Sequence, residues 1–277
     1  MVAFWSFNYI TTKVALREFP SLLLAPLRTL FAGVVILPIY FGRRRKRSSW
    51  TLREGAALAV LGVCGVALNQ VFFVLGLAHT SVAHGAILIA LTPVQVLLLA
   101  AAIGQEKLTW SKLTGLAVAL SGVAVLQLSH AGGAAPSIAG DALILLSGFS
   151  LAVYSVFGKK LTSRHDAVTM NTFAYAGGAV ALAPMIFWNA RGFDFRAVTP
   201  LAWMSLLYMA VFSSVVSYLI YNFALSRMAA SRVSAFSYLQ PLMATAMAIP
   251  ILGEHLTRSL FAGGALVLSG VWMTERG

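Results

Sequence analysis

Long apolar runs alternate with short polar segments along the whole chain. The runs predict ten membrane-spanning helices, at about 1–18, 20–41, 54–77, 81–103, 109–128, 140–158, 167–189, 201–225, 230–252 and 258–274. Runs of this length exceed the roughly ten alternating residues that a transmembrane strand needs. The connections are short and leave no room for a soluble domain. The predicted fold class is therefore an all-α integral membrane protein with ten transmembrane helices.

A short pattern occurs twice, at an offset of 148 residues and without a gap. The first copy contains Leu77, Pro93, Glu106, Gly115 and Gly122, and the second contains Leu225, Pro241, Glu254, Gly263 and Gly270. Each copy belongs to a set of five predicted spans, and an odd number of spans turns the second set upside down. The chain is thus expected to form two inverted five-helix repeats, 1–128 and 140–274, around a central cavity.

Composition and charge support a membrane protein and indicate its orientation. Hydrophobic residues make up 59% of the chain and charged residues 10%, too few charges for a soluble domain of this length. With both termini in the cytoplasm, 14 Lys and Arg residues lie inside and five outside, as the positive-inside rule requires. The net charge of +12 does not indicate nucleic acid, because the largest basic run, Arg43 to Arg47, lies between two hydrophobic stretches. No basic segment precedes the first apolar run, so no signal peptide is expected. We expect a multi-pass protein of the cell inner membrane, in contact with membrane lipids.

The stretch from Asn69 to Leu126 closely resembles the EamA module of the drug/metabolite transporter superfamily. The stretch from Tyr218 to Met273 resembles the same module. Trp5, Asn8 and Lys13 look like the family's opening pattern, although Ser6 stands where a glycine is usual. The resemblance covers essentially the whole chain. It implies ten helices, a central cavity, alternating access and export of metabolites or drugs, often amino acids.

Pro93 and Pro241 fall near the middle of predicted spans four and nine, at equivalent repeat positions. Proline removes a backbone donor and frees the carbonyl four residues earlier, here those of Ile89 and Ser237. A freed carbonyl in lipid needs a partner or a water-lined cavity, so matched interruptions point to a transport site. We interpret the two prolines as gating or kink positions; the alternative is a structural kink without contact to a solute.

Span nine carries Ser234, Tyr238, Pro241 and Thr245 on one helical face, which should look inward because lipid contact would be costly. The corresponding residues of span four are mostly apolar, so the polar contacts of the cavity are expected mainly from the second half. The full set of candidate substrate-binding residues is Asn8, Thr12, Asn69, Gln70, Gln95, Tyr154, Tyr175, Ser214, Ser217, Tyr218, Ser234 and Tyr238, and His84 is a further inward residue. Each could equally hold helices together by hydrogen bonds.

The charged residues add further expectations. All eight carboxylates lie at or near predicted span ends, which disfavours a proton-coupled exporter of cations. Lys13 and Arg28 could face each other and attract a substrate carboxylate; the alternative is that they reach the outer headgroups or pair with Glu18. Glu106 and Glu254 are expected to close the turns into spans five and ten.

The small residues have expected structural roles. Gly115, Gly122, Gly263, Gly264 and Gly270 should allow spans five and ten to pack closely as a scaffold. Cys64, the only cysteine, excludes a disulfide framework and is expected in the core.

The sequence therefore predicts a secondary transporter that exports small metabolites, with amino acids first. The alternative is a multidrug or cationic drug efflux transporter, and an intramembrane enzyme is a remote third hypothesis. No enzyme activity, metal or cofactor is expected, because the chain has no HExxH or Walker motif, and Gly253-Glu254-His255 has the wrong spacing.

Overall fold

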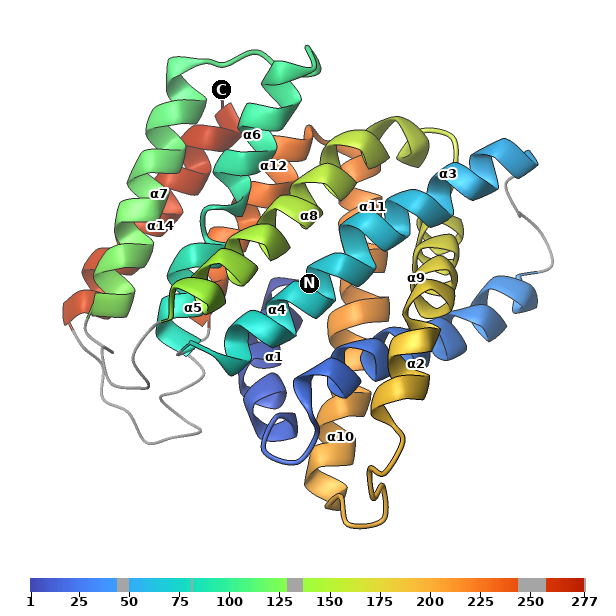
Figure 1. The fold of residues 1–277 in the computed structure, drawn as a ribbon. Coiled ribbons are helices and arrows are strands. Elements are labelled where there is room, and N and C mark those ends of the chain that lie inside the picture. The colour runs from blue at the N-terminus through green and yellow to red at the C-terminus, as the bar shows by residue number, and fades with distance from the viewer. Residues whose placement is uncertain (44–49, 81, 129–136, 244–257, 277) are drawn as a thin grey trace.

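The computed structural model describes residues 1–43, 50–80, 82–128, 137–243 and 258–276, and the regular structure in these ranges is helical (Figure 1). The α-helices are α1 (Val2–Ala15), α2 (Ser21–Gly42), α3 (Leu52–Gly62), α4 (Leu68–Ala78), α5 (Val82–Ile89), α6 (Thr92–Ala102), α7 (Trp110–Leu128), α8 (Ile138–Thr162), α9 (Ala167–Asn189), α10 (Pro200–Tyr208), α11 (Ser217–Arg227), α12 (Ala230–Ala235) and α14 (Arg258–Arg276). Two π-helical segments, η1 (Val63–Ala67) and η2 (Met209–Val216), and one 3₁₀ segment, η3 (Phe236–Tyr238), join some of them. The prediction of an all-α protein is confirmed.

In the described ranges, six helical segments are long and apolar enough to cross a membrane, and each coincides with a predicted span. They are Ser21–Gly42, Leu52–Ala78, Gly85–Ala102, Ile138–Thr162, Ala167–Asn189 and Pro200–Arg227. Two shorter apolar helices, Trp110–Val125 and Phe261–Thr274, lie at predicted spans five and ten. The first predicted span contains α1, which has 14 residues, and residues 244–252 of the ninth lie outside the described ranges.

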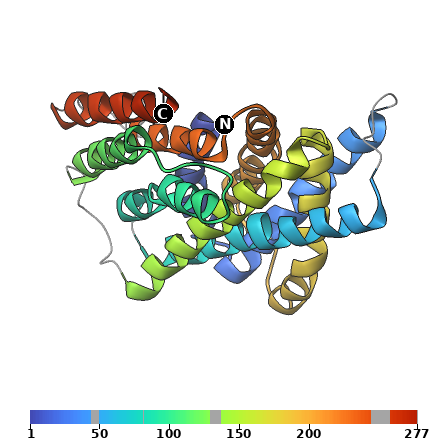
Figure 2. The same cartoon turned by 90° about the horizontal axis from the view of Figure 1, so that it is seen from above.

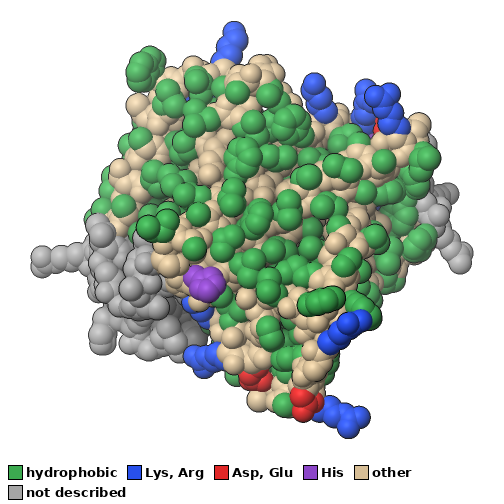
Figure 3. Space-filling model, in the orientation of Figure 1, with side chains coloured by type: hydrophobic (Ala, Val, Ile, Leu, Met, Phe, Trp, Pro, Cys, Tyr) green, Lys and Arg blue, Asp and Glu red, His purple; other side chains and the backbone are tan. Residues whose placement is uncertain are grey.

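The surface has the distribution expected of a chain surrounded by lipid. Figure 3 shows hydrophobic side chains across the middle of one face, with Lys and Arg toward its upper and lower margins. Val180, Val60 and Leu268 illustrate this surface, with exposed fractions of 76%, 62% and 55%. Cys64 also lies on the surface, so the expectation that it is a core residue is wrong. The reason is that its neighbour Gly65 takes the inward position against α8.

The two π-helical segments occupy equivalent positions of the repeat. Adding 148 to the bounds of η1 gives 211–215, which lies within η2. A π turn widens a helix locally and is frequent at functional sites. In η1 the widened turn packs closely on α8: a Cβ on Gly65 would lie 2.3 Å from the Cβ of Tyr154. The third and eighth predicted spans are therefore both irregular at equivalent positions of the repeat.

The chain also departs from α-helix just before each of the two matched prolines. α5 ends at Ile89 and α6 begins at Thr92, with Pro93 in its first turn. α12 ends at Ala235 and is followed by η3, three residues before Pro241. Proline is tolerated in a first helical turn, because the amide that it lacks has no intrahelical partner there.

α7 and α14 lie side by side in both ribbon views (Figures 1 and 2). A Cβ on Gly270 would lie 2.5 Å from the carbonyl oxygen of Gly115, and a Cβ on Gly122 would lie 2.7 Å from that of Gly263. The pairing runs in opposite directions along the two helices, so they are antiparallel. Close approach at these glycines agrees with the predicted role of the residues.

Contacts between helix ends and connections join segments that the charge pattern assigns to the same side. At the predicted inner side, Arg43 pairs with Asp166 at 3.0 Å. At the predicted outer side, Glu18 accepts a hydrogen bond from the Thr199 hydroxyl at 2.7 Å. The described contacts are therefore compatible with the alternation of span directions.

Candidate functional site

A cavity lies between α1, α2, α4, α8 and α11, bounded also by the break between α5 and α6 and by residues 237–240. Its interior volume is about 70 Å³, enough for several water molecules. Its lining residues are Trp5, Asn8, Tyr9, Arg28, Asn69, Gln70, Phe73, Ile89, Thr92, Ser147, Leu151, Tyr218, Ser237 and Gln240. The cavity thus combines aromatic walls with amide and hydroxyl groups, and among the described lining residues Arg28 is the one that carries a charge.

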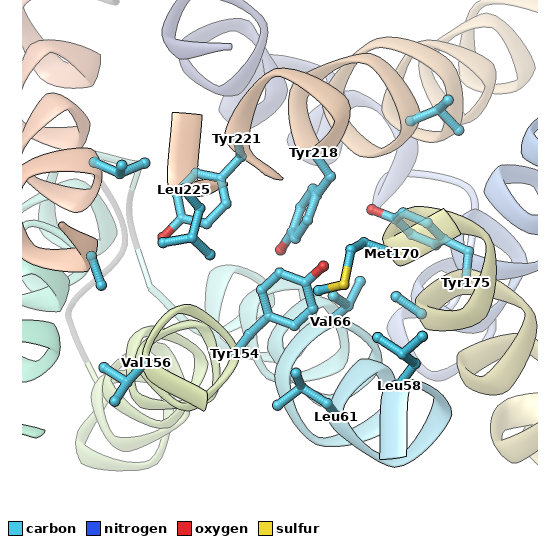
Figure 4. Packing of buried hydrophobic residues seen from close by; sticks show 14 of the residues in the cluster. Leu58, Leu61, Val66, Tyr154, Val156, Met170, Tyr175, Tyr218, Tyr221 and Leu225 are labelled. Carbon is cyan, nitrogen blue, oxygen red and sulfur yellow. The ribbon is translucent and has the colours of Figure 1, made fainter. Parts of the chain in front are cut away.

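Trp5 and Tyr218 line the cavity and belong to a cluster of aromatic side chains, whose four tyrosines are shown in Figure 4. The ring of Tyr218 lies at its centre, with centroids 5.9 Å from those of Tyr154 and Tyr175. Trp5 approaches Tyr218 at 5.8 Å and Tyr221 at 5.7 Å. Edge-on aromatic pairs at such distances add to the stability gained by burial. This cluster is therefore rigid and closely packed.

A hydrogen-bond network connects α2, α4, α9 and η2 beside this cluster. The Nε2 of Gln70 donates to the Tyr175 hydroxyl at 3.0 Å, and its Oε1 accepts from Thr29 at 3.2 Å. The Ser214 hydroxyl accepts from Arg28 Nε at 3.0 Å and donates to the carbonyl of Met209. The hydroxyl-to-carbonyl bond spans five residues, a separation that the π-helical turn of η2 favours. The irregular segment thus supplies the hydroxyl that fixes Arg28.

The expectation that Lys13 and Arg28 face each other is not met. The ammonium group of Lys13 donates to the carbonyls of Leu77 and Thr80, at the end of α4. Arg28 is 4% exposed, so it neither reaches the headgroups nor pairs with Glu18. Helix C-termini carry unpaired carbonyls that attract cations, which explains the position of Lys13.

Matching hydrogen bonds connect the two halves around the cavity. The side-chain amide of Asn69 in α4 donates to the carbonyl of Ser147 in α8 at 2.8 Å. Its repeat mate Ser217 donates to the carbonyl of Met1 at 3.4 Å, from α11 toward α1. The Asn69 oxygen also accepts from the Tyr218 hydroxyl at 3.3 Å. Asn69 therefore both lines the cavity and ties the halves together.

Ile89 and Ser237, the residues four positions before Pro93 and Pro241, both line the cavity. The interruptions at Pro93 and Pro241 are therefore adjacent to the same space, although they lie on different helices. Gly148 allows this arrangement, because a Cβ there would lie 2.6 Å from the Thr92 hydroxyl.

Four predicted substrate-binding residues line the cavity: Asn8, Asn69, Gln70 and Tyr218. The remaining eight are not among its lining residues: Thr12, Gln95, Tyr154, Tyr175, Ser214, Ser217, Ser234 and Tyr238. Tyr175 and Ser214 belong to the network that holds Gln70 and Arg28.

Several of the other predicted residues make contacts between or within helices. The Tyr154 hydroxyl donates to Asn222 at 3.0 Å, and Gln95 donates to the carbonyl of Leu145 at 3.3 Å. The hydroxyl of Thr12 lies 3.9 Å from the sulfur of Met209.

The two predicted contact residues of span nine, Ser234 and Tyr238, are buried but do not line the cavity. The hydroxyl of Ser234 donates to the carbonyl of Ser231. Tyr238 is fully buried among apolar residues, and no described residue accepts from its hydroxyl. Thr245, on the same predicted face, and the His84 side chain lie outside the described residues.

The expectation that polar contacts come mainly from the second half is wrong for this cavity. Its polar lining from the first half is Asn8, Tyr9, Arg28, Asn69, Gln70 and Thr92, and from the second half it is Ser147, Tyr218, Ser237 and Gln240. Aromatic and polar residues at positions 5, 8, 9 and 12 occupy one face of the first helix, a signal that could have added Trp5 and Tyr9. Ser147 and Gln240 carry no such sequence signal.

Glu106 lies outside the cavity and ties the turn between α6 and α7 to the start of α12. Its carboxylate accepts from Lys112 at 2.8 Å and from the Ser231 amide at 3.0 Å. Burial raises the pKa of Glu106, but these hydrogen bonds together outweigh burial and hold the pKa below its ordinary value. Glu106 thus closes its own turn, as expected, and also caps a second helix. Glu254 lies outside the described residues.

Helices that are apolar outside and interrupted beside a polar interior cavity are the arrangement of a membrane transporter with a solute site between its helices. The model of the EamA-like transporter family matches residues 1–128 and again residues 138–276. The chain therefore belongs to the EamA-like transporter family, and it is a multi-pass membrane protein.

Relatives with assigned names are transporters too. An uncharacterized transporter of Archaeoglobus fulgidus is 31% identical over 99% of this chain and 96% of its own length. A probable terminal-alkyne amino-acid exporter of Streptantibioticus cattleyicolor is 29% identical, covering 99% and 91%. A probable amino-acid metabolite efflux pump of Salmonella typhimurium is 27% identical, covering 100% and 93%.

A solved crystal structure shares the fold, with a TM-score of 0.78 at 18% identity, and the match covers 98% of this chain and 93% of that one. At this identity the likeness concerns the fold alone.

Proposed function

We propose that this protein is a secondary transporter that exports small metabolites across the cytoplasmic membrane by alternating access, and that amino acids are its main solutes. The observation that carries the proposal is the polar cavity beside two interrupted helices. Ile89 lines this cavity from the first half and Ser237 from the second. The names of two relatives, an amino-acid exporter and an amino-acid metabolite efflux pump, support the choice of solute. None of the described lining residues is acidic, which disfavours cationic drugs as the main solutes.

The proposed architecture is ten membrane helices in two inverted repeats, 1–128 and 140–274. Support comes from contacts that occur twice. Adding 148 to Gly115 gives Gly263, and subtracting it from Gly270 gives Gly122, so the contact of Gly115 with Gly270 repeats as that of Gly122 with Gly263. The double match of the family model supports the same division.

Two lysines provide a second repeated contact. Lys13 donates to the carbonyl of Leu77, and Lys159 donates to that of Leu225, the repeat mate of Leu77. In each half, a lysine side chain thereby connects one helix to the end of another. Such paired contacts favour rocking of one bundle against the other over separate movement of single helices.

We propose that both termini lie in the cytoplasm. The test replaces Cys64 by Ala and then introduces a cysteine at Ser48 or Ser137, in the connections predicted inside and outside. An impermeant thiol reagent applied to intact cells should label position 137 and leave position 48 unlabelled. Labelling of position 48 from outside would reverse the orientation.

The experiment that tests export is flux in proteoliposomes containing the purified full chain. Labelled amino acids and a quaternary ammonium dye are compared as solutes, with empty liposomes as the control. The proposal expects saturable movement of at least one amino acid and none of the dye. Movement of the dye alone would favour drug efflux instead.

A further inference from the structure

Arg28 is a charged side chain in the interior of a membrane helix. It is the eighth residue of α2, about 10 Å along the helix axis from Ser21. It is 4% exposed and lines the cavity, and the other lining residues are uncharged. A charge at such a position is costly to bury, and where it occurs it commonly marks a solute or ion pathway. Its position therefore calls for a partner.

The described residues provide a hydrogen-bond partner for only one of the three guanidinium nitrogens of Arg28. Ser214 accepts from Nε at 3.0 Å, which orients the guanidinium plane. No described residue accepts a hydrogen bond from the two terminal nitrogens, and no described carboxylate forms an ion pair with them. The terminal nitrogens form a planar fork that matches the two oxygens of a carboxylate.

We propose that Arg28 binds the carboxylate of the transported solute, so that the site takes small organic acids, including zwitterionic amino acids, and rejects lipophilic cations. The inference rests on the proposed export through this cavity. Asn8 completes the site for an amino acid: it is 5% exposed, and no described residue donates to its Oδ1, which is free to accept from an amino group. Phe73 and Leu151 supply apolar lining for the remainder of the solute.

Charge and geometry together give this selectivity. A guanidinium in a cavity of low dielectric attracts a carboxylate strongly and repels a cation by the same law. Ser214 holds Nε from a helix turn that is itself fixed by the bond to Met209, so the fork is oriented before the solute arrives. A preoriented fork loses less side-chain entropy on binding than a flexible ammonium group.

The test compares acids with their amides on the purified full chain. Thermal stabilisation in detergent is measured with each neutral L-amino acid, with the corresponding carboxamide, with simple monocarboxylates and with tetraphenylphosphonium. We expect stabilisation only by solutes with a free carboxylate. The same ranking should appear when these solutes compete with a labelled one for uptake into proteoliposomes.

Three variants assign the effect to Arg28. Arg28→Gln should raise the half-saturating concentration of the best acid about 30-fold or more, and Arg28→Lys, which keeps the charge but loses the fork, about tenfold. Arg17→Gln is the matched control, because Arg17 is exposed and in the same half, and it should change nothing. If Arg28→Gln fails to fold, Arg28→Lys and the comparison of acid with amide on the parent protein decide the matter.

The outcomes separate this inference from export itself. Equal binding of acids and amides, or unchanged affinity in both Arg28 variants, would overturn the role of Arg28 while leaving transport standing. Binding of monocarboxylates but of no amino acid would overturn amino-acid export and support Arg28 as a carboxylate anchor. Binding of tetraphenylphosphonium alone would overturn both.

Discussion

The contact between α7 and α14 and the surroundings of the cavity represent two ways of holding membrane helices together. α7 and α14 meet backbone to backbone at Gly115 and Gly122. Around the cavity, the helices meet through buried or partly buried side chains such as Gln70, Asn69 and Ser214, which donate and accept across three or more helices. Both arrangements are compact, but they respond differently to change.

Packing at glycines leaves no room for an alternative arrangement, because van der Waals contacts are lost as soon as the helices separate. Hydrogen bonds among hydroxyls and amides can be exchanged for bonds to water or solute at little net free energy. We therefore expect α7 and α14 to act as a fixed scaffold and the hydrogen bonds of the cavity network to exchange more readily. The predictions below test this contrast.

The largest effect is expected from a bulky residue in the scaffold. A Cβ on Gly270 would lie 2.4 Å from the amide nitrogen of Ala119, so Gly270→Leu forces the helices apart. We expect a loss of about 3 kcal/mol or more and little folded protein in size-exclusion chromatography of detergent extracts. Gly42→Leu is the control, because nothing lies within 4 Å of a Cβ there. Equal amounts of both folded variants would show that the scaffold is not close-packed in the membrane.

The next effect concerns the ion pair of Glu106 and Lys112, whose side chains are each 8% exposed. Glu106→Gln leaves Lys112 buried without its counter-charge, and we expect a loss of about 3 kcal/mol, seen as a lower melting temperature at pH 7. Arg43→Gln removes a mostly exposed pair and should cost about 0.5 kcal/mol.

The same pair predicts a pH dependence. The pKa of Glu106 is lower in the folded protein than its ordinary value, so the stabilisation is present at pH 7 and is lost as the pH falls through the folded pKa. The difference in stability between the parent and Glu106→Gln should therefore begin to shrink as the pH falls below the ordinary pKa of a glutamate, about 4.3, and vanish below the lower pKa of the folded protein. A constant gap from pH 7 to pH 3 would contradict this.

The smallest effect on stability and the clearest effect on transport are expected at the prolines. Pro93→Ala and Pro241→Ala should leave the amount of folded protein unchanged but slow flux about three- to tenfold, because continuous helices favour one access state. Pro184→Ala is the control, since Pro184 is an exposed proline inside α9 and away from the cavity. Unchanged flux in both matched variants would remove their gating role.

The sequence was sufficient to predict the helices and the interruptions next to Pro93 and Pro241. Apolar length alone located six membrane segments to within a few residues, because burial in lipid dominates their stability. The offset of 148 located the interruptions and the glycine contacts, since residues at equivalent positions meet equivalent neighbours.

The side-chain partners could not be predicted in the same way. The residues next to Arg28 in the sequence do not indicate whether its side chain reaches the headgroups or points inward. Its inward direction depends on the hydrogen bond to Ser214, which is 186 residues away. Tyr238 shares a predicted face with Pro241, but the 3₁₀ turn at Phe236–Tyr238 changes the helical phase that the prediction assumed.

The charge of the cavity lining has a consequence for the energy source of transport. Arg28 is the one charged residue among the described residues of the lining, and none of these residues is a carboxylate that could carry a proton in return for a solute. An organic acid that leaves the cell as a monoanion moves one negative charge outward, and an inside-negative membrane potential drives it by about 2.3 kcal/mol per 100 mV. A zwitterion moves no net charge and depends on its own concentration gradient. The voltage dependence of flux therefore distinguishes the two kinds of solute.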